Sequence, residues 1–134
     1  MSFASHMSIT VVGLMLCQPS AALALDDARL NQQLMRLDPD TRLEQTCDTE
    51  VMFRINREQK AFSVDKVIAY TFKAPTAEDN VIKAPGAVFR SRGEWYHLAY
   101  ECKTGPRHLD AQSLVYTIGQ KVLKSQWASH YLYD

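Results

Sequence analysis

Side chains that could bind a ligand gather between residues 88 and 101. Arg92-Gly93 is predicted to form a two-residue turn, and this register places Arg90 opposite Trp95. An aromatic ring beside a guanidinium can stack on a sugar or a peptide and pair with its anionic groups. We therefore predict an open sheet face that binds a ligand, with the candidate residues Arg90, Arg92, Trp95, His97 and Glu101.

A simpler interpretation of the same face needs no ligand. The face would be a solvated sheet surface whose tryptophan is covered by the C-terminal segment, because Trp127 and Tyr131 need a place to pack. From the sequence, both interpretations stay open.

Catalysis is the second functional hypothesis, in the form of a small envelope hydrolase that uses His97 or His108. His97 and Glu101 share a strand face, but about 13 Å separates their Cα atoms, which is too far for a direct acid–base pair. His108 precedes Asp110 in a loop, where ordinary turn chemistry explains both residues. The sequence contains no G-x-S-x-G or H-E-x-x-H motif. Binding is therefore favoured over catalysis, and no cofactor is expected.

The N-terminal segment has the pattern of a cleavable secretory leader. Residues 1–24 contain no Lys, Arg, Asp or Glu, and their centre, Ile9 to Leu16, is apolar. Pro19 breaks this run, and Ala22-Leu23-Ala24 supplies the small residues for a cut after Ala24. We expect residues 25–134 to form a single mature domain outside the reducing cytosol.

A retained membrane anchor or a lipoprotein signal would fit this segment less well. An anchor needs about 18 apolar residues, and Gln18-Pro19-Ser20 interrupts the run too early. A lipoprotein signal would place a small residue before Cys17, where Leu16 stands. We therefore expect no stable membrane insertion once the leader is cut.

The cysteines agree with export. Cleavage removes Cys17 and leaves Cys47 and Cys102 as an even pair. In an oxidising compartment the simplest outcome is a disulfide, and two unpaired buried thiols are the alternative. Zinc is not expected, because no C-x-x-C occurs and no histidine lies at ligand spacing from either cysteine.

The charge balance restricts the partners. Lys and Arg together number 15, and so do Asp and Glu, which gives a formal net charge of zero. Such a balance argues against a general nucleic-acid binder or a binder of anionic membranes. An envelope protein or a glycan remains as the expected partner.

Two helices are predicted ahead of the strands. Residues 26–37 carry Leu30, Leu34 and Leu37 on one face. Asp38-Pro39-Asp40 then starts a second helix, because Asp38 is a good N-cap and proline suits the first turn. This helix should end between residues 56 and 58, and its apolar stripe recurs every four residues: Leu43, Cys47, Val51 and Ile55.

Strands follow, because β-branched and aromatic residues then alternate with polar ones. We expect strands over 64–72, 81–91, 94–103 and 112–118, an irregularity at Pro85-Gly86, and a short final helix from Ser125 through Tyr131. The predicted register turns one set of side chains toward the second helix: Phe89, Tyr96, Leu98, Tyr100 and Cys102. Cys102 would thus face the helix that carries Cys47. The predicted fold class is α+β, with two N-terminal helices packed on an antiparallel three- or four-stranded sheet and a short C-terminal helix.

Five stretches of the chain resemble one known family. They are Leu37-Asp38-Pro39, the helix around Cys47, the stretch from Ala84 to Tyr96, Tyr100-Glu101-Cys102, and Ser125-Gln126-Trp127. Together they resemble the alphaproteobacterial exported family catalogued as domain of unknown function 930. The resemblance implies a location in the envelope or periplasm. It implies no activity, so no catalytic residue is carried over from it.

The leader pattern gives a first prediction. We expect the protein to be exported and cut after Ala24, so that mass spectrometry of protein recovered from the producing cells finds a chain that starts at Leu25 or within a few residues of it. An intact Met1 terminus on soluble periplasmic protein would contradict this.

Overall fold

The helical part of the fold is centred on α2, Pro39–Glu58, in a computed structural model that describes residues 28–134. The expected leader and its cleavage site lie outside the described residues. The Asp38 side chain accepts a hydrogen bond from the Thr41 backbone N–H at 3.1 Å, and Pro39 occupies the first turn. The predicted start of this helix is thus confirmed, and its end at Glu58 lies within the expected range.

The first helix ends earlier than the sequence indicates. Within the described residues, α1 spans Ala28–Leu34, whereas the prediction extended to Leu37. The guanidinium of Arg42 on α2 donates hydrogen bonds to the backbone oxygens of Leu34, at 3.2 Å, and of Leu37, at 2.9 Å. Carbonyls at the end of a helix lack partners within it, and the Leu34 oxygen here accepts hydrogen bonds from Arg42 and from the Leu37 backbone N–H, the latter at 3.0 Å. No helix in residues 28–134 is long and apolar enough to cross a membrane.

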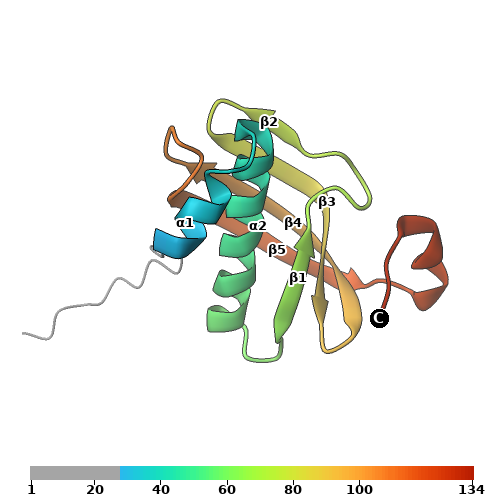
Figure 1. The fold of residues 1–134 in the computed structure, drawn as a ribbon. Helices are drawn as coiled ribbons and strands as arrows, with labels where there is room; N and C mark the ends of the chain where they lie inside the picture. Colours follow the sequence, from blue (N-terminus) through green and yellow to red (C-terminus); the bar gives the residue numbers. More distant parts are fainter. Residues whose placement is uncertain (1–27) are drawn as a thin grey trace, which may run out of the picture.

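All strand pairs in the described part of the chain are antiparallel, which confirms the α+β class. The strands follow the order β1-β3-β4-β5, and the short β2 also pairs with β3 (Figure 1). Their bounds are β1 Val64–Ile68, β2 Thr76–Glu78, β3 Val81–Ser91, β4 Glu94–Thr104 and β5 Ala111–Lys121.

The β3–β4 hairpin has the register that the sequence predicts. Ser91 pairs with Glu94, and Arg90 pairs with Trp95. The turn residues Arg92 and Gly93 both have positive φ, at 50° and 76°. Two positive φ values suit the two-residue turns whose twist matches that of the flanking strands.

An irregularity at Pro85-Gly86 divides β3 into two halves, as expected. The register shifts between Ala84 and Ala87, so that β2 pairs with the first half of β3 and β1 pairs with the second half. The predicted strand 64–72 therefore ends at Ile68, and the chain leaves the sheet. It passes so close to Gly86 that a Cβ atom there would clash with the backbone nitrogen of Lys73.

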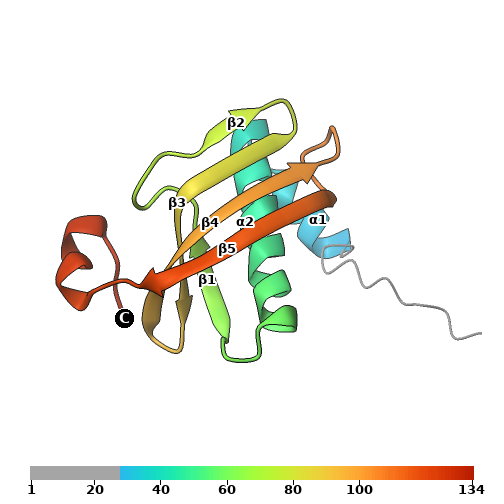
Figure 2. The ribbon, with the colours of Figure 1, turned by 180° about the vertical axis from the view of Figure 1, so that it is seen from behind.

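The main core lies between α2 and one face of the sheet (Figures 1 and 2). The predicted helix stripe shares one buried cluster with strand residues that include Phe89, Leu98 and Tyr100. Within this cluster a disulfide joins Cys47 of α2 to Cys102 of β4, with a Cα–Cα distance of 6.0 Å. The predicted cysteine pairing is thus confirmed.

A second, smaller core lies on the opposite face of the sheet. The chain after β5 forms two 3₁₀ turns, η1 (Lys124–Gln126) and η2 (Ala128–His130), where one short helix was expected. This segment lies beside the end of the sheet in Figure 2. Its apolar side chains pack with side chains of β3 and β4 in a cluster of Val88, Trp95, Val122, Trp127 and Leu132.

The disulfide gives a second prediction. Both cysteines are fully buried, and cross-linking a 55-residue separation contributes roughly 4 kcal/mol in the chain-entropy model. Unfolding the protein in the presence of a phosphine reductant should therefore lower Tm by about 15 °C, at about 4 °C per kcal/mol. The doubly substituted Cys47→Ala/Cys102→Ala protein is the control, since the reductant should not change its Tm. An equal response in both proteins would contradict the stabilising role of the bond.

Candidate functional site

The expected open face around Trp95 is wrong, because the C-terminal segment covers it. Trp95 is fully buried in the second core beside Trp127 and Leu132. Its indole N–H donates a hydrogen bond to the backbone oxygen of Tyr133 at 2.8 Å. The simpler interpretation, in which the C-terminal segment covers this tryptophan, agrees with the structure for Trp127, whereas Tyr131 is 88 % exposed and does not pack in this core.

The two arginine candidates are held by structural contacts. The Arg90 guanidinium lies 5.6 Å from the centre of the Trp95 ring, so the two predicted cross-strand neighbours form a cation–π pair. Arg90 also donates two hydrogen bonds to the Asp65 carboxylate, at 2.9 and 3.0 Å. These hydrogen bonds lower the pKa of the Asp65 carboxyl. Arg92 donates to the backbone oxygen of Ala61 at 2.8 Å.

The remaining candidates do not converge on one site. The centre of the His97 ring lies 4.5 Å from the centre of the Phe72 ring. The centre of the Phe72 ring in turn lies 4.3 Å from that of the His130 ring. Glu101 is exposed and pairs across the strands with Lys83. Glu101 therefore lies far along the hairpin from Arg90 and Arg92, and the His97 ring packs against Phe72 rather than against either arginine.

His108, the other histidine of the hydrolase hypothesis, ties two elements together. Its Nδ1 atom lies 2.6 Å from the Pro39 backbone oxygen, and its Nε2 atom lies 3.1 Å from the Asp79 backbone oxygen. Both ring nitrogens thus face backbone acceptors, and neither is directed at an open site.

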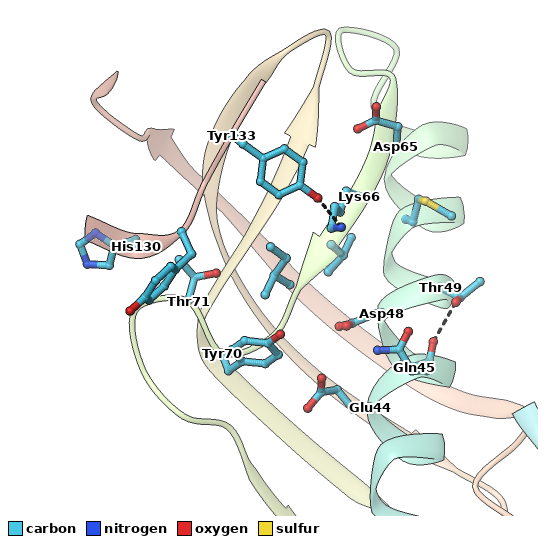
Figure 3. Close-up of a pocket in the computed structure, with 14 residues that line it drawn as sticks. Glu44, Gln45, Asp48, Thr49, Asp65, Lys66, Tyr70, Thr71, His130 and Tyr133 are labelled. Atoms are coloured by element: carbon cyan, nitrogen blue, oxygen red, sulfur yellow. Dashed lines mark hydrogen bonds between the residues drawn. The ribbon is translucent and has the colours of Figure 1, made fainter. Parts of the chain in front are cut away.

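The structure instead contains a groove of about 690 Å³ between α2, β1 and the C-terminal segment. This volume is in the range of small-molecule sites. Figure 3 shows side chains of α2 on one wall and aromatic side chains of the other segments facing them. The principal lining residues are Glu44, Asp48, Lys66, Tyr70, His130 and Tyr133.

Asp48 is the most perturbed group in this groove. Its side chain is only 6 % exposed, and its Oδ1 accepts a hydrogen bond of 2.6 Å from the Tyr100 hydroxyl. Burial raises the pKa of Asp48 to about 7, and the neighbouring Glu44 carboxyl adds to this rise. Burial also raises the pKa of Glu44 and of Tyr100. Asp48 can therefore exist in either protonation state near neutral pH.

The opposite end of the groove carries a cation. The Lys66 ammonium donates a hydrogen bond of 2.7 Å to the Tyr133 hydroxyl, which lowers the pKa of that phenol. Figure 3 shows Lys66 and Tyr133 at one end, whereas Glu44 and Tyr70 lie toward the other. The groove thus carries the two α2 carboxyl groups toward one end and the Lys66 ammonium at the other, where Asp65 also lines it but is paired with Arg90.

The sequence did not predict the groove, because the burial of Asp48 and the turn at Tyr70 both depend on the tertiary structure. The one available signal was the spacing of Glu44 and Asp48, four residues apart on one face of a predicted helix. Asp48 is buried only because Tyr100 and the sheet lie over it, and Tyr70 was expected in a strand rather than in the turn where it lies.

The architecture defines a small α+β protein with an antiparallel sheet, a buried disulfide and a groove at one edge of the sheet. The family model of the Domain of Unknown Function DUF930 matches residues 34–132, and the chain belongs to this family. The resemblance to this family seen in the sequence is thereby confirmed. No curated protein and no solved structure matches the chain.

The Asp48 carboxyl gives a third prediction. Its pKa is about 7 in the folded protein against an ordinary 3.8, so the folded state binds this proton more tightly than the unfolded state does. The resulting stability is fully present below about pH 4 and is lost as the pH rises to about 7. Compared with Asp48→Asn, the wild type should therefore lose up to about 4 kcal/mol of unfolding free energy over this range, at about 1.4 kcal/mol per pKa unit.

Urea denaturation of the wild type and Asp48→Asn at the two ends of this pH range checks the prediction. Asparagine can still accept the hydrogen bond from Tyr100, so the variant represents the uncharged acid. Glu101→Gln, which alters an exposed carboxylate on β4, should keep the pH profile of the wild type. A constant difference between the wild type and Asp48→Asn at all pH values would show that this carboxyl has no raised pKa.

Proposed function

We propose that the protein is an exported, non-enzymatic module of the periplasm that binds a cell-envelope ligand or protein in the groove between α2, β1 and the C-terminal segment. The observation that carries this proposal is the groove itself, with about 690 Å³ of space and a nearly buried carboxyl in its wall. Segments distant in the sequence build it, because α2, β1 and residues 130–133 all contribute side chains.

The positions of the histidines favour binding over hydrolysis. The His97 ring packs against Phe72, and both ring nitrogens of His108 face backbone oxygens. A general base must reach the proton that it abstracts. A hydrolase based on His97 or His108 remains the second candidate and is included in the test below.

Two observations support export. The leader pattern precedes the described residues. The Cys47–Cys102 disulfide is of a kind that persists mainly in oxidising compartments and is rare in the cytosol.

The fourth prediction tests the binding site. Soluble peptidoglycan fragments are titrated into isotope-labelled protein, and amide chemical shifts are followed by NMR. We expect shifts in α2 around Asp48 and in the turn around Tyr70. Tyr70→Ala should weaken this response with little loss of stability, because the Tyr70 side chain is 60 % exposed. Leu123→Ala, a similarly exposed apolar side chain outside the groove lining, is the matched control.

Copurification from the periplasm extends the test to protein partners. A stable envelope protein that Tyr70→Ala releases and Leu123→Ala retains would favour the accessory form of the proposal. Fragment turnover that His97→Ala or His108→Ala abolishes would replace the proposal with the hydrolase. Binding that Tyr70→Ala and Leu123→Ala leave equally intact would exclude the groove as the site.

A further inference from the structure

We propose that the groove binds an organic cation, with a primary ammonium group seated between the carboxylates of Glu44 and Asp48 and beside the ring of Tyr70. This inference rests on the proposed function and specifies the chemical class of its ligand. Figure 3 shows both carboxyl groups projecting from α2 into the groove, with Tyr70 across from them.

The two carboxyl groups have unused acceptor capacity. Asp48 is 6 % exposed and its Oδ1 is bonded to Tyr100, but its Oδ2 accepts no hydrogen bond from any described residue. The ion pairs among residues 28–134 involve other acidic side chains. Neither Glu44 nor Asp48 has a basic partner within 4.0 Å in this part of the chain. A buried carboxylate without a cation is costly. An ammonium group brings three hydrogen-bond donors to this position.

The aromatic side of the groove fits the same ligand. Tyr70 is 60 % exposed although its ring lines the groove, so burial in a core does not explain its position. A cation near the face of an exposed aromatic ring gains about 0.5–1 kcal/mol. Carboxylates on one side and an aromatic ring on the other therefore attract an ammonium group from both walls.

The basic end of the groove limits what else the ligand carries. Lys66, bonded to the Tyr133 hydroxyl, lies toward the other end, and the Asp65 carboxylate there is already paired with Arg90. A second ammonium there would be repelled, whereas a neutral or anionic group would be tolerated. This arrangement favours a lysine-like side chain on a peptide over a free diamine.

The fifth prediction uses calorimetric titration of the disulfide-bonded protein recovered after export, at a pH near 8, where Asp48 is ionised. The probes are Nα-acetyl-lysine methylamide and Nα-acetyl-norleucine methylamide, an uncharged analogue whose alkyl side chain ends where the lysine ammonium would begin. We expect the lysine compound to bind and the norleucine compound to bind at least about tenfold more weakly, because a hydrogen bond to a charged group contributes about 1.5–3 kcal/mol.

Two variants locate the ammonium group. Glu44→Gln and Asp48→Asn should each weaken binding of the lysine compound by about tenfold or more, whereas Glu101→Gln on the other face of the sheet should leave it unchanged. Glu44 is only partly buried and Asp48→Asn keeps an acceptor for Tyr100, so both variants should fold, which circular dichroism checks. The third probe is 1,5-diaminopentane, and tighter binding of this diamine would still support the cation site while assigning it to free amines rather than peptides.

The outcomes separate this inference from the proposed function. Equal affinity for the lysine and norleucine compounds, or no binding of any amine, would overturn the cation site. If peptidoglycan fragments still shift the amides around Asp48 and Tyr70 in that case, the groove remains the binding site for another class of ligand. If no probe affects the groove, both proposals fail.

Discussion

The attachment of α2 to β4 is the constraint on which the rest of the structure depends. Two neighbouring links make it: the Cys47–Cys102 disulfide, and the hydrogen bond from Tyr100 to Asp48, the next residue of the helix. The covalent link fixes the distance between α2 and β4 at this point of the helix. The polar link can then place a carboxyl group at the inner edge of a groove. The stability of the domain and the chemistry of its candidate site thus depend on the same turn of α2.

Features that follow from local chemistry could be predicted from the sequence. The cap at Asp38, the hairpin turn at Arg92-Gly93 and the cross-strand pair of Arg90 and Trp95 each depend on residues that are neighbours along the chain or across one turn. The disulfide could also be predicted, because the phase of the helix and the phase of the strand both turn a cysteine inward.

Features that depend on the path of a distant segment could not be predicted. Whether Trp95 is exposed depends on the route of residues 122–134, and alternation along a strand carries no information about that route. The groove is a similar case, since the C-terminal segment supplies one of its walls. The same segment that removes Trp95 from solvent therefore also supplies one wall of the groove beside β1.

The close approach at Gly86 has a consequence for how this groove can vary among related chains. A methyl group at position 86 would meet the backbone of Lys73, and Lys73 belongs to the same turn as Tyr70 and Thr71, which line the groove. Any larger residue there would require the backbone around Lys73 to shift. A position outside the groove lining thus restrains the turn that carries two of the lining side chains.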